Sequence, residues 1–331
     1  EGMELKYSLA LGMCACLLLF PARCAEQARS AMALWAQAVA PALFPFLALL
    51  PVLTSEEARD GYERLFARPM RAFRLPGRAA SAAVVGLMAG TPAGAAAAGR
   101  CANALSPRQR FTLGILVSGL GPVFLVCSVG AGMFADAAVG ARLWGSMALS
   151  LMLGAFLCAR LPETWFHGRT AADAAARGEN AMTSAILGVL SVCGWMTLTS
   201  VIGGLLPEAA QPYIEVSRGC FLAAQARNAT LAAFLCGFGG ICAGLQNRAR
   251  LTLSGVDTRW FFTAKALCGG LCAGIYRLTE YLRLPAMPET FAPYRAACVC
   301  AAALAVLALL LGIGKFTGHR RGTAQDESET K

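Results

Sequence analysis

The stretch AASAAVVGLMAGTPAGAAAAG, residues 79–99, decides the fold. It carries no charged residue, so it is apolar enough to lie within a lipid bilayer. Its centre, Gly90-Thr91-Pro92-Ala93-Gly94, is too rich in glycine and proline for one smooth helix. We therefore expect two short helices that meet at the tip of a re-entrant hairpin. A helix N-terminus at this tip would point unpaired N–H groups toward the middle of the molecule.

Apolar runs like this one recur along the whole chain. Of its 331 residues, 57% are hydrophobic and 15% are charged, whereas a soluble domain is about half apolar and a quarter charged. The nine runs are Tyr7–Ala22, Ser30–Ser55, Ala79–Gly99, Phe111–Ala135, Leu143–Ala159, Asn180–Pro207, Asn228–Asn247, Trp260–Tyr276 and Ala296–Gly314. They do not alternate as the strands of a membrane barrel do. We predict an all-α, polytopic membrane protein with a single membrane domain over residues 1–331, ending in a polar tail at 315–331.

The positive charge lies between the apolar runs. The net charge is +10, and the connection Glu56–Arg78 alone contains six arginines: Arg59, Arg64, Arg68, Arg71, Arg74 and Arg78. The positive-inside rule explains this pattern and places the connection in the cytoplasm. We therefore expect a multi-pass membrane protein and no binding of nucleic acid.

The sequence offers no catalytic or metal-binding pattern. The 14 cysteines lie mostly within apolar runs and include no CxxC pair, and His167 and His319 are the only histidines. Buried free thiols are the expected state of such cysteines. The motifs GxxxxGK, HExxH and GxSxG do not occur. We expect no metal, no cofactor and no enzymatic activity.

A weak internal repeat accompanies the glycine-rich segment. A shift of 150 residues aligns 89–94 with 239–244, and the two units would be residues 31–135 and 181–277. Phe238–Gln246 would then form the tip of a second re-entrant hairpin on the opposite side of the membrane. Inverted repeats of this kind are typical of secondary transporters. The alternative is that small residues recur only because they let helices pack closely.

Two further proline segments predict breaks in helices. Pro41 and Pro45 lie four residues apart in the middle of an uncharged run, and Gly121-Pro122 follows Ser118 within another. Each proline removes a backbone donor and frees carbonyl groups, which protein or a water-lined cavity must satisfy. These breaks either line a transport path or are kinks that serve only packing.

Three polar side chains are candidates for solute binding. Glu215 can titrate with a coupling proton or bind a coupling cation such as sodium, and Arg218 can hold a substrate carboxylate. Alternatively the two form an interfacial ion pair on one helix face. The amide of Gln246 suits a heteroaromatic ligand, or it caps a helix. The candidate binding residues are Gly90, Thr91, Pro92, Gly94, Ser118, Gly121, Pro122, Glu215, Arg218, Gly239, Gly240 and Gln246.

The order of these segments resembles a known family. The matching pieces are Trp35 with Pro41–Phe46, then 90–95, Gly121–Phe124, 215–219 and 238–246. Together they resemble the sporulation integral membrane proteins of the YlbJ (SpoVV) type, in the nucleoside-recognition Gate group. The resemblance implies a fold similar to concentrative nucleoside transporters. It also implies movement of dipicolinic acid across a forespore membrane during endospore formation.

We therefore expect a transporter of a small organic anion, most simply dipicolinate, embedded in the lipid bilayer and driven by protons or sodium. One alternative is a nucleoside or nucleobase transporter of the same fold. The other is a membrane scaffold of the spore envelope that recruits partners through the basic connection and transports nothing.

Overall fold

The computed structural model describes residues 11–12, 14–15, 17–167 and 181–282. Residues 7–10, 13 and 16 of the first apolar run, the whole last run at 296–314 and the polar tail at 315–331 lie outside the described residues. Within them the chain is helical, and its only strand-like pairing is a single bridge between Gly90 and Leu120. The predicted all-α class is confirmed for this part of the chain.

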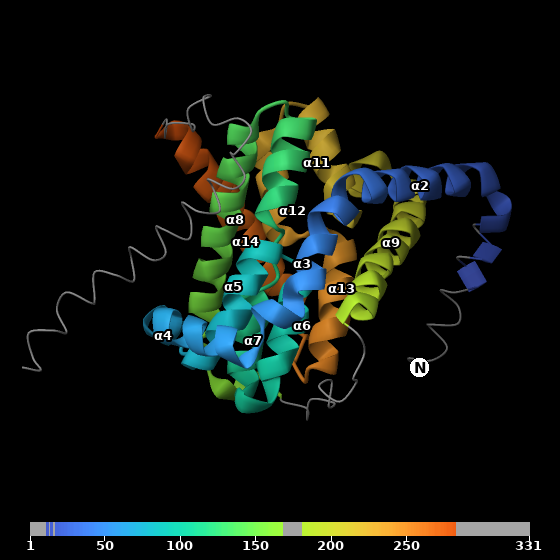
Figure 1. Cartoon of the computed structure of the whole chain (residues 1–331). Helices are drawn as coiled ribbons and strands as arrows, with labels where there is room; N and C mark the ends of the chain where they lie inside the picture. Colours follow the sequence, from blue (N-terminus) through green and yellow to red (C-terminus); the bar gives the residue numbers. More distant parts are fainter. Residues whose placement is uncertain (1–10, 13, 16, 168–180, 283–331) are drawn as a thin grey trace, which may run out of the picture.

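The helices form one bundle with a side arm (Figure 1). Their bounds are α2 Pro21–Leu34, η1 Trp35–Val39, α3 Ala40–Leu53, α4 Glu56–Ala72, η2 Gly77–Ala79, α5 Ala80–Ala89, α6 Ala93–Cys101, η3 Ala102–Ala104, α7 Pro107–Leu116, η4 Phe124–Met133, α8 Ala137–Cys158, η5 Glu163–Trp165, α9 Ala181–Leu205, η7 Glu208–Ala210, α10 Gln211–Ile214, α11 Val216–Gln225, α12 Ala229–Phe238, α13 Gly240–Leu253 and α14 Phe261–Tyr281. The side arm consists of α2 and α9, which pack against each other.

Four helical segments of the described residues are long and apolar enough to cross a membrane. They are Pro21–Leu53, Ala137–Cys158, Ala185–Leu205 and Ala229–Leu253. The apolar helices Gly77–Ala89 and Phe124–Met133 are shorter. The structure thus agrees with a helical membrane protein, but with fewer full-length spans than the number of apolar runs suggested. The last of the nine runs lies outside the described residues, and the runs Ala79–Gly99 and Phe111–Ala135 are divided by breaks into pieces too short to cross a bilayer of about 30 Å.

The predicted break near Pro41 lies one turn upstream of the proline. α2 runs across the top of the molecule in Figure 1, and the chain turns at η1 before α3 descends into the bundle. η1 is a stretch of π-helix, and Pro41 lies in the first turn of α3. Proline has no N–H to donate to the carbonyl four residues earlier, which explains the local change of helical geometry. The Trp35 indole N–H donates to the Val189 carbonyl at 3.2 Å and fixes this bend against α9.

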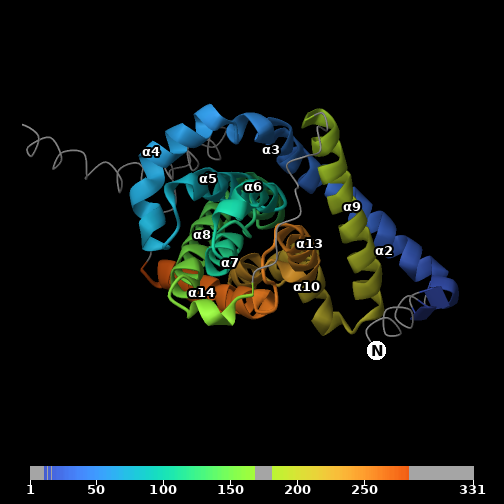
Figure 2. The ribbon, with the colours of Figure 1, turned by 90° about the horizontal axis from the view of Figure 1, so that it is seen from below.

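The basic connection is itself a helix. Ser55 caps α4 by accepting a hydrogen bond from the Ala58 N–H, and Phe66 and Met70 on one side of α4 are buried. Most of its arginines face away from the core. Figure 2 shows α4 at the rim of the bundle. A buried apolar stripe beside a basic face is typical of a helix that lies in the membrane interface.

Close backbone packing joins α5 and α6. The two helices meet at Gly90 and cross where Gly86 contacts Gly94, so closely that a Cβ on Gly94 would lie 2.6 Å from the Gly86 Cα. The expected helical pair around Gly90 therefore forms. The second expected hairpin tip does not, because Gly239 only interrupts the apolar helix Ala229–Leu253. In that half, the short helices α10 and α11 meet instead at Glu215.

Two hydrophobic clusters hold the bundle together. One lies around α3, α5 and α9, and the other lies where α8, α12 and α14 pack, with Leu143, Met147, Leu151 and Tyr276 fully buried in it. Buried free cysteines are part of the second cluster: Cys158, Cys220, Cys236, Cys268 and Cys272. They act there as small apolar side chains that allow close helix contacts. For example, a Cβ on Gly237 would lie 2.6 Å from the Cys272 Cβ.

Candidate functional site

Two helix breaks, one between α5 and α6 and the other between α7 and η4, meet at Gly90 and form the first pair of breaks. This residue has φ +69° and ψ −161°, a backbone conformation essentially restricted to glycine. It lies against the second break, between α7 and η4, where the Thr91 N–H donates to the Gly119 carbonyl at 2.8 Å. A Cβ on Gly90 would collide with the Gly121 nitrogen and lie 2.7 Å from the Leu120 carbonyl carbon. Each break thus satisfies backbone groups that the other leaves free.

The second pair of breaks, one between α10 and α11 and the other between α12 and α13, meets at Glu215. This residue is extended, with φ −130° and ψ 121°, and its carboxylate caps α11 by accepting hydrogen bonds from the N–H groups of Ser217 at 3.0 Å and Arg218 at 2.8 Å. The break at Gly239 and Gly240, both with positive φ, packs directly beside it. A Cβ on Gly240 would lie 3.0 Å from the Val216 nitrogen. Glu215 is 4% exposed, so its charge lies inside the protein.

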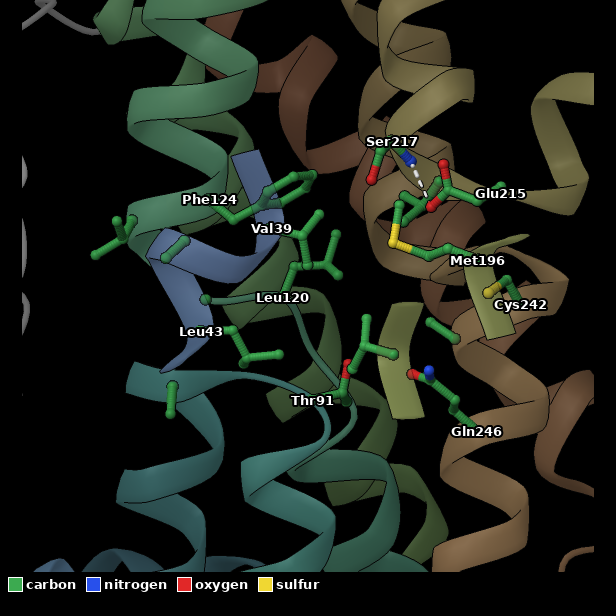
Figure 3. A pocket seen from close by; sticks show the side chains of 17 residues that line it. Val39, Leu43, Thr91, Leu120, Phe124, Met196, Glu215, Ser217, Cys242 and Gln246 are labelled. Carbon is green, nitrogen blue, oxygen red and sulfur yellow. Dashed lines mark hydrogen bonds between the residues drawn. The ribbon is translucent and has the colours of Figure 1, made fainter. Parts of the chain in front are cut away.

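A cavity lies between the two pairs of breaks (Figure 3). It has an empty volume of about 630 Å³, including its opening to solvent. Its lining residues come from η1, α3, α5, α9, η4, α11, α13 and the break segments: Val39, Ala42, Leu43, Ala89, Thr91, Leu120, Gly121, Val123, Phe124, Val192, Met196, Glu215, Val216, Ser217, Cys242, Ala243 and Gln246. The wall is mainly apolar, with a few polar groups, as is usual for small-molecule sites.

The polar groups of the cavity include one unused donor. The Gln246 side chain is 6% exposed, and its Nε2 has no hydrogen-bond partner among the described residues. Figure 3 shows the Gln246 amide and the Thr91 hydroxyl turned toward each other across the cavity. A buried amide donor without a partner is costly, and a bound solute would satisfy it. Gln246 is therefore the clearest candidate for direct solute contact.

The twelve residues predicted from the sequence divide into three groups. Thr91, Gly121, Glu215 and Gln246 line the cavity. Seven others build the breaks around it without lining it: Gly90, Pro92, Gly94, Ser118, Pro122, Gly239 and Gly240. Arg218 forms the third group by itself, because its side chain points to another part of the molecule. Most of the predicted residues thus determine the backbone that shapes the site rather than contact a solute.

The Arg218 guanidinium is held beneath the side arm. It donates from Nη1 to Gln27 Oε1 at 2.9 Å and from Nη2 to Gln211 Oε1 at 3.1 Å. It lines a second cavity with Gln27, Ser200 and Phe221, which shares Glu215 with the first. Its contact with Glu215 is through the backbone N–H, and no side-chain ion pair joins the two. The expected helix-face ion pair is therefore absent, and Arg218 does not reach the central cavity.

Two residues of this region were not predicted. Ser217 lines the cavity beside Glu215. Lys265 of α14 is 1% exposed, and its Nζ donates to the Ser118 carbonyl at 3.0 Å, directly behind the first pair of breaks. The signal for Lys265 was present, because it is the single charge in an otherwise uncharged run. A charged residue at membrane depth is rare and usually functional.

Comparison of the chain with protein-family models, with curated proteins and with solved structures gives no match.

Proposed function

We propose that this chain is a membrane transporter of a small polar solute that binds in the central cavity. One observation carries the proposal: helix breaks from both halves of the chain converge on a single buried cavity. Broken helices at membrane depth are tolerated only where protein or a water-filled cavity satisfies the freed backbone groups. Secondary transporters bind solutes and coupling ions at such places. The protein would then belong to a bacterial cell membrane, with a forespore membrane as the location that the family resemblance implies.

The proposed architecture is a pair of inverted repeats in a revised register. Each half has two short helices that meet at a break, then an interrupted helix, then a long helix. In the first half the two short helices are α5 and α6, the interrupted helix is α7 with η4, and the long helix is α8. In the second half the two short helices are α10 and α11, the interrupted helix is α12 with α13, and the long helix is α14. This order pairs Gly90 with Glu215, rather than with the segment near Gly240. We propose that α5–α6 and α10–α11 are the two re-entrant hairpins.

Dipicolinate is the first candidate solute, on the strength of the family resemblance. It is a planar pyridine dicarboxylate of a size that fits the cavity. Its carboxylates would be stabilised by the N–H groups at the start of α13, where Gly240 begins the helix beside the cavity. Gln246 would donate to a carboxylate oxygen or to the ring nitrogen.

A nucleoside or nucleobase is the second candidate, and the composition of the cavity favours it. The lining contains no lysine or arginine, and its one charged group is the carboxylate of Glu215. A dianion in an apolar cavity beside a carboxylate is opposed by desolvation and by charge repulsion. An uncharged base could instead exchange hydrogen bonds with Gln246 and Thr91 and stack against Phe124.

Uptake into proteoliposomes decides among these functions. Labelled dipicolinate and labelled uridine would be offered to the full-length protein, with proton and sodium gradients applied separately. Uptake of dipicolinate alone supports the anion, and uptake of uridine alone supports the nucleoside. Uptake of neither by folded protein would refute transport of these solutes and favour the scaffold that acts through the arginines of α4.

Gln246→Leu is the variant that tests the site, because it removes the unpaired donor and keeps the side-chain size. We expect at least a tenfold loss of uptake, which corresponds to about 1.4 kcal/mol, a usual value for one hydrogen bond to a solute. Gln225→Leu is the matched control, since Gln225 lies on α11 with its side chain exposed and outside the cavity. Equal uptake by the two variants would contradict the assignment of the site.

A further inference from the structure

The ammonium group of Lys265 lies where two half-helices end. α7 ends at Leu116, and the Ser118 carbonyl just beyond it accepts the hydrogen bond from Lys265 Nζ at 3.0 Å. α12 ends at Phe238, and a Cβ placed on the next residue, Gly239, would lie 3.6 Å from Lys265 Cε and 3.9 Å from Nζ. One ammonium group is thus adjacent to the C-terminal ends of both interrupted helices.

A cation is the group that this position requires. The last carbonyls of a helix have no partner within the helix, and aligned peptide dipoles give the C-terminus a partial negative charge. Two such ends meet here in the interior, where α14 packs against α8 and α12. Transporters with interrupted helices place coupling cations against unwound carbonyls and half-helix C-terminal ends. Lys265 supplies a positive charge at the same kind of position from within the chain.

No acidic side chain explains the burial of Lys265. Among the described residues no carboxylate forms an ion pair with it, and the titratable groups that interact with it are the thiols of Cys236, Cys268 and Cys272. Only one hydrogen bond from its Nζ is present within the described part of the chain, although an ammonium group has three donors. A buried charge with so few partners is costly. A role in packing alone does not account for it, because methionine would fill the same volume without a charge.

We propose that Lys265 is a tethered cation that fills a small-cation site between the two helix breaks. The site therefore needs no free sodium ion in the native protein. If the side chain is shortened to alanine, the site is left open and takes up a small monovalent cation, for which methylammonium is the closest mimic of the lost group. This inference does not depend on which solute the central cavity binds.

The test is thermal unfolding of the purified full-length protein in detergent. Wild type, Lys265→Ala and Lys265→Met are each measured in methylammonium, sodium and choline chloride at equal ionic strength. We expect Lys265→Ala to unfold at a temperature at least about 3 °C higher in methylammonium than in choline, which is too large for the site. Wild type and Lys265→Met should show no such difference, because in both a side chain fills the site.

Two results would overturn the proposal. One is a folded Lys265→Ala variant that no small cation stabilises relative to choline. The other is stabilisation of wild type by sodium or methylammonium relative to choline that is lost in Lys265→Met, because the site would then take a free cation beside the lysine. This second comparison remains informative if the alanine variant does not fold. Because the readout is stability, failure of uptake in the transport assay leaves this test intact.

Discussion

Gly90→Ala is the substitution that most directly tests the paired breaks. Glycine at this position has φ +69° and ψ −161°, and an alanine held there is strained by about 1–3 kcal/mol. The added methyl group would also overlap the Gly121 nitrogen and lie 3.0 Å from the Gly119 carbonyl oxygen. Both contacts are backbone atoms, so relief requires the two breaks to separate, at a further cost of about 1–3 kcal/mol. The free energy of unfolding should therefore fall by at least about 2 kcal/mol.

The assay is thermal unfolding of purified protein in detergent, with Gly145→Ala as the matched control. Gly145 lies within α8, and a Cβ there would meet no atom within 4 Å. Alanine is favoured over glycine inside a helix by about 0.5–1 kcal/mol, so the control should be at least as stable as wild type. Gly90→Ala should unfold at a temperature at least about 4 °C lower. Equal unfolding temperatures for the two variants would refute the close contact between the breaks.

Three further changes test other parts of the structure. Trp35→Phe removes the hydrogen bond to the Val189 carbonyl and should lower the free energy of unfolding by about 0.5–1.5 kcal/mol, measured by the same thermal assay. Ser106→Ala removes the capping box of α7 and should cost about 1 kcal/mol, and no loss of stability would contradict the cap. Burial opposes ionisation of Asp257 in the loop before α14, but hydrogen bonds from Arg259 and from nearby N–H groups lower its pKa to about 2. Its stabilising effect is complete above the unfolded pKa of about 4 and is lost as the pH falls toward 2, so Asp257→Asn should be less stable at neutral pH and equal to wild type near pH 2.

The sequence predicts the breaks well because their causes are local. Proline lacks a backbone donor and glycine lacks a Cβ, so Pro41, Gly90 and Gly121-Pro122 weaken a helix locally, although α3 runs through Pro45 without the predicted break. The all-α class follows in the same way from uncharged runs that do not alternate. These features need only the chain near each residue, and the structure places a bend or break at each of them.

The pairing of the breaks depends on contacts that the sequence does not display. The shift of 150 residues matched one glycine-rich segment with another, but the register proposed above pairs Gly90 with Glu215, which is not a glycine. A carboxylate that caps the following helix gives that break its geometry, so similarity of residues is a poor guide to the repeat. Arg218 was assigned to the solute because of its charge, whereas its Nη1 and Nη2 donate to Gln27 and Gln211. Gln27 is 191 residues away, and only the packing of α2 brings the two together.

The distribution of satisfied and unsatisfied hydrogen-bonding groups bears on where the proposed solute would bind. At the first pair of breaks the Thr91 N–H donates a hydrogen bond to the Gly119 carbonyl, and the Ser118 carbonyl accepts one from Lys265 Nζ. At the second, the Glu215 carboxylate takes up the first N–H groups of α11. The backbone of the breaks is thus stabilised by the protein itself, which lets these helices end inside the bundle without a ligand. The unpaired donor at the cavity belongs to the Gln246 side chain, so the proposed solute would be recognised there and would not be required for the integrity of the fold.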